Sequence, residues 1–476
     1  MSDYNKLTPE LIDQLVAIVG SDNCYVGDEI AEDYSHDEMP IYGSQAPEIV
    51  CLPASTEEVS RIMKLCYDNT IPVTVRGAGT GLAGGCTPLC GGVVLSTMRM
   101  DKIIEYDMNN LTVRIQPGVR LCDLAADALE HDLMYPPDPG EKTGSVGGNV
   151  STNAGGMRAV KYGTTRDYVL AMTAVLPNGE VVELGPAVTK SSSGYSLLHL
   201  IIGSEGTLAI ITELTMKLIP NPQVSISFIL PFENIEEAIG SVPSIKLAGL
   251  NPQSIEFMER DIVDSSANYT GNDIFPTVVQ GREVGAYILV TLDGNDEDEI
   301  MQRAERLMEV SEEKGAYDVL VVNQPSIRDA VWEARSAFLT VIEAEADLLD
   351  EMDVVVPVDR IAEFLEYVHG VGVEYGVRIR SFGHAGDGNL HIYCSGNDLD
   401  RDEFMALSEK VMEAAYKKCT ELDGQVSGEH GIGHAKKQYL RSSVGETLYG
   451  LMGDIKTIFD PKHILNPGKV CHDLEA

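Results

Sequence analysis

Three features typical of other protein classes are missing from this sequence. It has no apolar run near the roughly 18 residues of a membrane-spanning helix, and residues 1–6 lack the basic and apolar regions of a signal peptide. Its nine cysteines are scattered, and only Cys86 and Cys90 lie close together, which is not the spacing of a disulfide scaffold or an iron–sulfur site. We therefore expect a protein of the reducing cytoplasm that does not span a membrane.

Basic residues are also scarce. The chain has 35 Lys and Arg against 74 Asp and Glu, which gives a formal net charge of -39. Like charges repel, so nucleic acid and anionic membrane surfaces are disfavoured as partners. With 476 residues and 44% hydrophobic residues, the chain is long and apolar enough for two or three globular domains.

The pattern of apolar residues predicts four parts. Residues 1–46 read as helical, with a helix that opens at Thr8-Pro9-Glu10 and stops at Gly20. Residues 47–222 alternate short strands, helices and glycine-rich turns. Residues 223–425 combine amphipathic helices with strands such as 286–291, 319–322 and 354–357, and residues 426–476 form a C-terminal segment. The expected fold class is α+β, with two principal domains.

A first glycine-rich loop follows the predicted strand 72–76 and covers residues 76–85. Gly79, Gly81 and Gly84 match G-x-G-x-x-G, the motif of Rossmann nucleotide sites. That motif must open a helix, whereas Pro88 and the predicted strand 93–96 follow this one. We therefore reject a Rossmann site and expect backbone N–H groups of the loop to bind a diphosphate.

Two more glycine-rich elements follow in the same region. Seven glycines lie between residues 140 and 163, interleaved with small hydroxyls and amides, and Gly203-Ser204-Glu205-Gly206-Thr207-Leu208 precedes a strand. Such segments have few side chains to pack. Three of them in one region indicate a binding site for a large, polar cofactor.

A cluster of histidines lies further along the chain. Residues 378–384 and 389–393 alternate like strands around turn-forming residues 385–388, so a hairpin would place His384 near His391. Glu429 could add a carboxylate, and two imidazoles with one acid suit Zn²⁺, Fe²⁺ or Mn²⁺. From spacing alone, hydrogen-bonded histidines in a polar core are an equal alternative.

These motifs resemble a known family. R-G-x-G-T-x-x-x-G-G, P-D-P, G-G-N-x-x-T-N-A-G-G and G-S-E-G-T-L resemble the FAD domain of the vanillyl-alcohol-oxidase type, also called the PCMH-type fold. Residues 384–391, Glu429-His430-Gly431 and Asn466-Pro467-Gly468-Lys469 are similar to the D-lactate dehydrogenase and glycolate oxidase catalytic-subunit branch. The resemblance implies a two-subdomain FAD-binding domain and an α+β substrate domain with an antiparallel sheet.

The resemblance also implies roles for particular residues. His384, His391 and Glu429 would bind a divalent metal, His430 would take the proton of the substrate, and Arg335 would bind its carboxylate. The implied FAD-binding residues come from all the glycine-rich elements and their neighbours: Arg76, Gly77, Ala78, Gly79, Thr80, Gly81, Gly84, Gly85, Pro137, Asp138, Thr143, Gly144, Ser145, Gly148, Asn149, Ser151, Thr152, Ala154, Gly155, Gly156, Glu205, Gly206, Ile210, Ile211 and Asn466.

The implied reaction is FAD-dependent oxidation of a small 2-hydroxy acid. Relatives that use dicarboxylates carry a further cation shortly before the predicted strand 354–357, but this chain has Asp350, Glu351 and Asp353 there. A monocarboxylate, D-lactate or alternatively glycolate, is therefore favoured. Electrons would pass to a partner such as an electron-transfer flavoprotein, or alternatively an iron–sulfur subunit. Two other classes remain open: a metal-dependent hydrolase or lyase, and a non-catalytic flavin-binding electron carrier.

Overall fold

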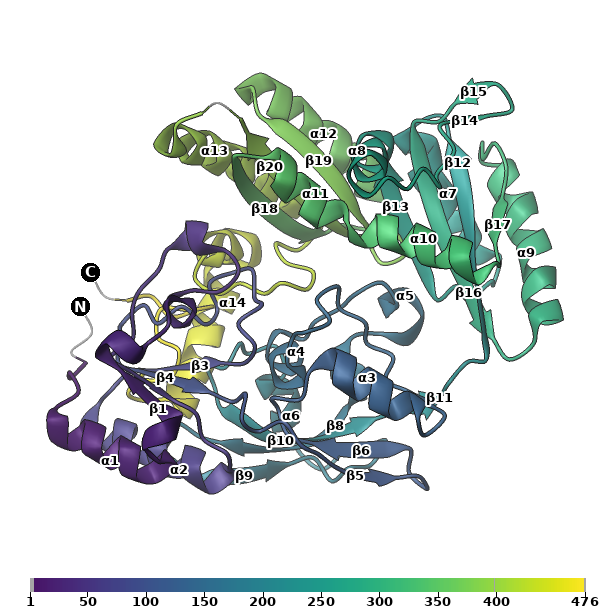
Figure 1. Ribbon diagram of the computed structural model, residues 1–476. Coiled ribbons are helices and arrows are strands. Elements are labelled where there is room, and N and C mark those ends of the chain that lie inside the picture. The colour runs from purple at the N-terminus through teal and green to yellow at the C-terminus, as the bar shows by residue number, and fades with distance from the viewer. Residues whose placement is uncertain (1–3, 398, 475–476) are drawn as a thin grey trace. The chain divides into compact units, whose positions relative to one another are not determined.

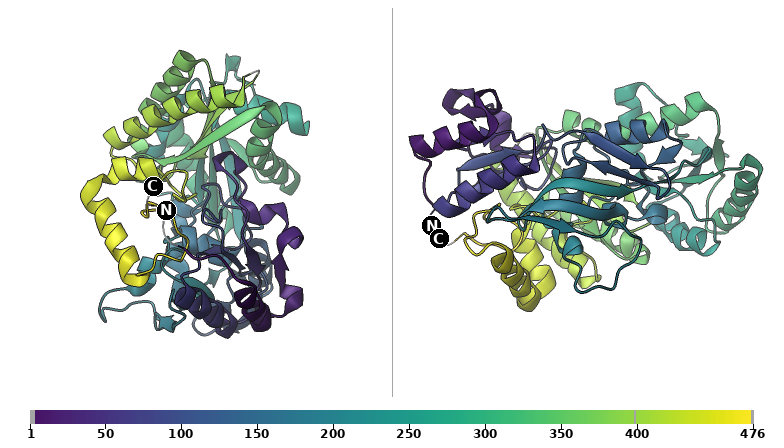
Figure 2. Two further views of the ribbon diagram at one scale, coloured as in Figure 1. Left: turned by 90° about the vertical axis from the view of Figure 1, so that its left-hand side faces the viewer. Right: turned by 90° about the horizontal axis from the view of Figure 1, so that it is seen from below.

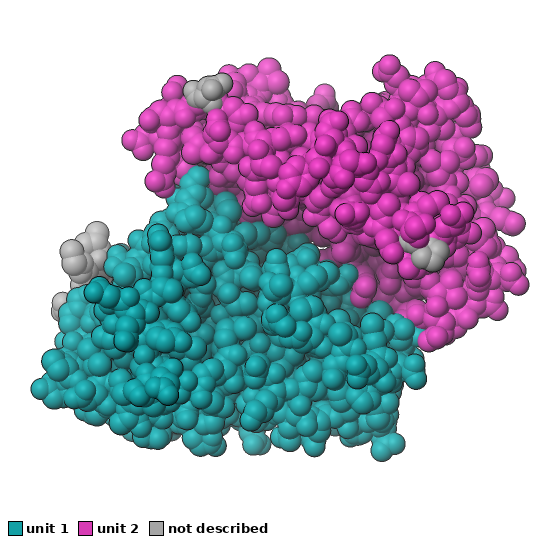
Figure 3. All heavy atoms as spheres, in the orientation of Figure 1, with its two compact units in different colours: residues 1–155, 164–221, 429–476 teal, residues 156–163, 222–428 magenta. Residues whose placement is uncertain are grey.

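The computed structural model describes residues 4–397 and 399–474. They form two compact units. Unit 1 contains residues 1–155, 164–221 and 429–476, and unit 2 contains residues 156–163 and 222–428 (Figure 3). The short segment 156–163 is held within unit 2, since Lys161 pairs with Asp293 and the Tyr162 hydroxyl donates to the same carboxylate at 2.6 Å. No helix of the described residues is long and apolar enough to cross a membrane.

Unit 1 begins with a four-stranded sheet. Its order is β1 (Cys24–Val26), β2 (Ile49–Cys51), β4 (Val93–Ser96) and β3 (Val73–Arg76), with β4 parallel to both β2 and β3. Helices α1 (Pro9–Val19) and α2 (Thr56–Asn69) lie side by side and share a core with this sheet (Figures 1 and 2). The predicted start of α1 is confirmed, because Thr8 caps this helix, and Ser55 caps α2 in the same way.

The expectation that residues 1–46 are helical holds only for α1. Cys24–Val26 instead forms β1, which pairs antiparallel with β2, and short 3₁₀ turns fill much of the rest. Gly20 and Gly27, both at positive φ, interrupt helical periodicity on either side of this strand. Residues 1–3 lie outside the described part of the chain.

A second sheet of unit 1 is antiparallel and five-stranded. Its order is β5 (Ile103–Asp107), β6 (Thr112–Ile115), β10 (Ile210–Lys217), β8 (Val169–Val175) and β9 (Val181–Leu184). The helices of this region are α3 (Leu121–Leu129), α4 (Val146–Thr152) and α6 (Leu197–Ile201), and a short pair joins β7 (Leu133–Met134) to β11 (Ile219–Pro220). The C-terminal helix α14 (Lys437–Phe459) also belongs to unit 1, and the segment after it reaches β3, where Leu465 bridges Val73.

Unit 2 is built on a seven-stranded antiparallel sheet. Its order is β17 (Leu320–Val322), β12 (Val224–Phe232), β16 (Ala286–Gly294), β13 (Ser254–Glu259), β19 (Arg378–His384), β20 (Asn389–Gly396) and β18 (Leu348–Val355). The helices and minor strands of the unit are α5 (Ala159–Tyr162), α7 (Ile235–Leu247), α8 (Arg260–Thr270), α9 (Glu297–Glu312), α10 (Pro325–Ser336), α11 (Phe338–Glu345), α12 (Ile361–Tyr375), α13 (Arg401–Glu421), β14 (Val278–Val279) and β15 (Arg282–Glu283). Helices α8, α10 and α11 share a core with Met258, Tyr287 and Phe382 on one sheet face (Figure 1).

The predicted strand 354–357 is wrong in its position. Strand β18 begins at Leu348 and therefore contains the acidic stretch that was expected to precede it. Carboxylates disfavour strands in general, but Asp350 and Asp353 each accept hydrogen bonds from neighbouring groups inside the fold. Asp350, for example, accepts from the Ser408 hydroxyl at 2.6 Å and from the backbone N–H of Glu351 at 2.9 Å.

Candidate functional site

The first glycine-rich loop of unit 1 runs from the end of β3 to β4 without a helix, as the sequence predicts. Gly77 has no room for a side chain, because a Cβ there would collide with Oγ of Ser145, the N-cap of α4. A Cβ on Gly144 would lie 3.4 Å from Oγ1 of Thr80. The first and second glycine-rich elements therefore pack directly against each other, as a shared diphosphate site requires.

The third glycine-rich element meets the C-terminal part of the chain. The Glu205 carboxylate accepts the backbone N–H groups of Ile432 and Gly433, both at 2.7 Å. A Cβ on Gly155 would lie 3.2 Å from Oε2 of Glu429. Residues 429–433 are thus held beside the second and third elements, and we call residues 76–85, 143–155, 203–207 and 429–433 together the glycine cradle.

The polar side chains of this region differ in what they offer a ligand. The side-chain nitrogen of Asn149 is buried and has no hydrogen-bond partner among the described residues, so it fits a polar group of a bound cofactor. Arg76 instead points within unit 1, where it donates to the His36 carbonyl at 2.7 Å and to Cys86 Sγ at 3.1 Å. Asp138 pairs with Lys142 at 2.5 Å. Both hydrogen bonds of Arg76 use the same guanidinium nitrogen, Nη1.

A cavity of 440 Å³ lies beside the first loop in unit 1. It is lined by Arg76, Gly77 and Ala78 together with residues from the N-terminal region and the end of β4: Tyr25, Glu29, Ala31, Asp33, Tyr34, Ser96 and Met98. Its two carboxylates, Glu29 and Asp33, outnumber the Arg76 guanidinium, so the net charge of the lining disfavours a diphosphate, while its two tyrosine rings suit a planar, uncharged group. The lining therefore matches the ring end of a dinucleotide better than its pyrophosphate.

Unit 2 contains the two histidines of the predicted hairpin. Strands β19 and β20 pair antiparallel, with Phe382 opposite His391 and His384 opposite Asn389, so the predicted hairpin is confirmed. The two histidines are diagonal neighbours on one sheet face. Their ring centroids are 5.4 Å apart, and each ring offers a nitrogen within 4.8 Å of the other. This spacing allows both rings to bind one ion.

A buried carboxylate joins His384 to Arg335. Glu256 on β13 is 0% exposed, and its side chain accepts from His384 Nδ1 at 2.8 Å and from a terminal guanidinium nitrogen of Arg335 at 2.7 Å. Burial alone would raise the pKa of the Glu256 carboxyl, but a protonated His384, the charge of Arg335 and the hydrogen bonds that both donate lower it below its ordinary value. The buried Nε of Arg335 has no hydrogen-bond partner in the described part of the chain, so this guanidinium retains a donor for an anion.

A second buried carboxylate lies on the other side of His391. Asp353 on β18 is directly opposite His391, and one of its oxygens lies within 4.8 Å of an imidazole nitrogen of that residue. It accepts from Asn389 Nδ2 at 2.7 Å, from the Ser427 hydroxyl at 2.8 Å and from the Gly428 backbone N–H at 3.0 Å. Asp353 therefore anchors the chain immediately before Glu429.

Models of two known protein families match successive regions of the chain. The FAD binding domain model matches residues 47–185, and the model of the C-terminal domain of FAD linked oxidases matches residues 221–470. A D-lactate dehydrogenase of Anaerostipes hadrus is 53% identical over 471 residues, which cover 99% of each chain. The chain belongs to the family of FAD-linked oxidases.

Further comparisons agree with this family. Glycolate oxidase subunit GlcD of Bacillus subtilis (strain 168) is 35% identical, over 98% of this chain and 97% of that protein. The structure of p-cresol methylhydroxylase has a TM-score of 0.80 at 18% identity, over 98% and 96% of the two chains, which supports the fold alone. These matches confirm the family resemblance and the PCMH-type fold class, and FAD is the cofactor of the family. The chain is therefore an oxidoreductase rather than a hydrolase, a lyase or a non-catalytic electron carrier.

The proposed site residues of this FAD-linked oxidase are divided between the two units. Unit 2 contains Arg335, His384, His391 and Gly156, while Glu429, His430 and the other candidate cofactor-binding residues belong to unit 1. Glu256 and Asp353 were missed as functional candidates. A lone acid inside the apolar run 255–258 is a weak signal for Glu256, and its two partners lie 79 and 128 residues away.

Proposed function

We propose that this FAD-linked oxidase oxidises a small 2-hydroxy acid, with D-lactate favoured, to the 2-oxo acid. The 53% identical relative named D-lactate dehydrogenase supports the substrate class. The observation that carries the proposal is the buried polar cluster of unit 2, in which Arg335 lies beside a carboxylate-bound histidine. The relative named glycolate oxidase subunit keeps glycolate as the second candidate.

Arg335 is proposed to bind the substrate carboxylate. Arg335 is 7% exposed, its guanidinium donates to Glu256, and its Cζ lies over the ring of Phe382, 4.6 Å from the ring centroid. Glu256 and the ring fix its plane, and the buried Nε is the donor still to be satisfied. A buried N–H without a partner costs roughly 1–3 kcal/mol, so a carboxylate that accepts it gains this amount in binding.

His384, His391 and Glu429 are proposed to hold a divalent metal, namely Zn, Fe or Mn. The nitrogen spacing of the two imidazoles supports this, and so does the anchoring of Gly428 by Asp353, because Glu429 is the next residue of the chain. Such an ion would supply a Lewis acid for the substrate hydroxyl. Asp353 is a further oxygen donor beside His391, although its hydrogen bonds to Asn389, Ser427 and Gly428 suit an anchoring role better.

His430 is proposed to accept the hydroxyl proton at an imidazole nitrogen. Its Nε2 lies 3.8 Å from Oε1 of Glu429, and both residues precede the segment that Glu205 fixes. A neutral imidazole suits a base at physiological pH. The substrate loses a hydride from C2 and a proton from its hydroxyl, and bound FAD would supply the two-electron acceptor. The chain's own contribution is to hold the carboxylate and hydroxyl in position.

The electrons are proposed to leave through a partner protein, an electron-transfer flavoprotein or alternatively an iron–sulfur subunit, in the cytoplasm. The cysteine spacing supports a separate acceptor, because it is not that of an iron–sulfur ligand set. Native co-purification tests this part by itself: a flavoprotein or an iron–sulfur protein in the complex identifies the acceptor.

Anaerobic flavin bleaching tests the proposed reaction. The FAD-loaded protein is mixed with D-lactate, L-lactate, glycolate and a 2-hydroxydicarboxylate, and flavin absorbance is followed. We expect D-lactate to bleach the flavin fastest. Faster bleaching by the dicarboxylate would contradict the assignment and direct attention to Arg380, a second buried cation, which pairs with Glu345 at 2.8 Å. Absence of bleaching by all four acids would contradict the substrate class.

A further inference from the structure

Glu256 joins the two halves of the candidate site in unit 2. One carboxylate oxygen lies 2.8 Å from Nδ1 of His384, and the other lies 3.0 Å from the same nitrogen and 2.7 Å from Arg335. All three side chains are buried, with 0% exposure for Glu256, 6% for His384 and 7% for Arg335. The buried charge of Glu256 is stabilised because His384 and Arg335 both donate hydrogen bonds to it.

The contact with Glu256 determines the tautomer of His384. An ionised carboxylate can only accept hydrogen bonds, so the proton of a neutral His384 ring must be on Nδ1. The lone pair is then on Nε2, on the far side of the ring from Glu256. A metal-binding histidine needs this arrangement, in which one ring nitrogen donates to a carboxylate and the other faces the ion.

We infer that Glu256 is a positioning residue that fixes the metal-binding tautomer of His384 and the guanidinium plane of Arg335 at the same time. The inference rests on the proposed metal and substrate roles of these two residues. The inference goes beyond these two roles because the Glu256 side chain then connects His384, the proposed metal ligand, to Arg335, the proposed binding residue for the substrate carboxylate. Loss of this carboxylate should weaken metal binding even in the absence of any substrate.

The test compares two glutamates of the same strand. Glu256→Gln keeps the shape of the side chain, but it removes the negative charge and places an NH2 donor where one of the two oxygens now faces His384 Nδ1. Glu259→Gln is the matched control, since Glu259 also lies on β13 and also pairs with a histidine, His369 Nε2 at 3.0 Å. His369 is outside the candidate site.

The measurement is Mn²⁺ and Zn²⁺ affinity of the metal-stripped, FAD-loaded protein by isothermal titration calorimetry. Loss of a carboxylate that orients a metal-binding histidine costs roughly 10–100-fold in affinity, so we expect Glu256→Gln to bind the ion that much more weakly while retaining FAD. Glu259→Gln should bind it like the parent protein. Equal affinity in the two variants would overturn the inference.

Two further variants complete the design. Arg335→Met is measured alone and with Glu256→Gln; if the double variant regains parent affinity, Glu256 only balances the charge of Arg335 and the inference is wrong. If Glu256→Gln does not retain FAD, Glu256→Asp replaces it, and unchanged metal affinity in that variant also overturns the inference. Parent protein that binds neither ion would instead contradict the proposed metal site itself.

Discussion

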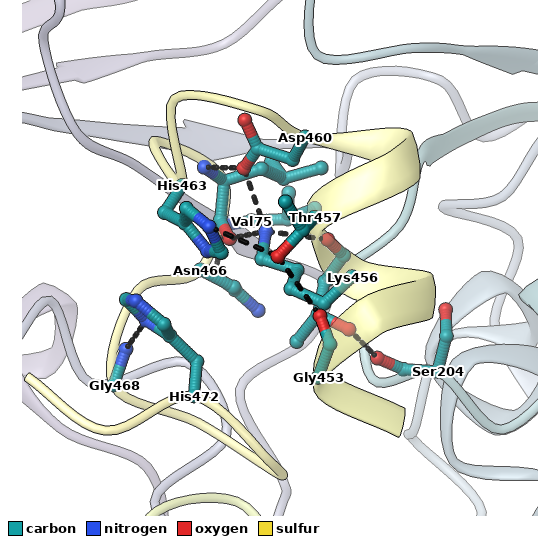
Figure 4. Close-up of polar contacts among 12 residues, drawn as sticks. Val75, Ser204, Gly453, Lys456, Thr457, Asp460, His463, Asn466, Gly468 and His472 are labelled. Atoms are coloured by element: carbon teal, nitrogen blue, oxygen red, sulfur yellow. Dashed lines mark hydrogen bonds and ion pairs between the residues drawn. The ribbon is translucent and has the colours of Figure 1, made fainter. Parts of the chain in front are cut away.

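Replacing Asn466 with Ala should loosen the glycine cradle. The Asn466 side chain accepts from the Val75 backbone N–H at 3.0 Å (Figure 4). It donates to the carbonyls of Glu205 at 2.8 Å and Gly85 at 3.5 Å. It is 2% exposed and has a φ of 46°. Its loss leaves the partly buried Val75 N–H and Glu205 carbonyl without this partner, at about 1–3 kcal/mol each, and the left-handed conformation costs Ala about 1 kcal/mol more.

The assay for this variant is the temperature at which flavin fluorescence appears as the protein unfolds. A loss of roughly 3–7 kcal/mol should lower this temperature by on the order of 10 °C for a unit of this size. The control is Asn251→Ala, since Asn251 has a φ of 44° but is exposed. It should shift the temperature by only a few degrees. Equal shifts in the two variants would refute the view that the Asn466 amide holds these segments together.

Three other substitutions test separate parts of unit 1. Lys456→Met leaves the Asp460 carboxylate buried without its cation and should cost about 3–5 kcal/mol; adding Asp460→Asn should recover much of the melting temperature (Figure 4). Burial first, and nearby positive charge second, lower the pKa of His472 from 6.5 to about 4. The unfolded chain therefore binds more protons between these two values, and the free energy of unfolding decreases as the pH is lowered. His472→Asn should therefore make the urea midpoint less sensitive to pH between 7 and 5, and an unchanged slope would argue against this. Gly77→Ala should reduce the FAD content measured by absorbance, whereas Gly140→Ala, where a Cβ meets nothing within 4 Å, should not.

The sequence predicted the hairpin of unit 2 correctly because all the necessary signals are local. Alternating residues on both sides of Ala385-Gly386-Asp387-Gly388 specify two strands and their turn, and the pairing then brings His384 toward His391. The family resemblance added the FAD cofactor and the fold. Both conclusions depend on short segments or on motifs read along the chain.

Glu256 was missed and strand β18 was predicted at the wrong position because the contacts that explain both are not local in sequence. Asp350 and Asp353 look unfavourable inside a strand until Ser408, Asn389 and Ser427 are brought beside them by folding. Burial of polar groups is decided by such partners rather than by intrinsic propensity. A single sequence contains the partners but not their proximity.

The most direct test of the central claim is single-turnover flavin reduction by D-lactate under anaerobic conditions, for the parent protein and His430→Asn. General-base catalysis contributes about 10²–10⁴-fold, so we expect the reduction rate to fall by that factor while FAD content stays the same. Rapid bleaching of the parent protein with that loss in the variant would support 2-hydroxy acid oxidation with His430 as the base. Near-parental reduction in His430→Asn would contradict the assignment of the base, and absence of reduction in the parent protein would contradict the proposed reaction.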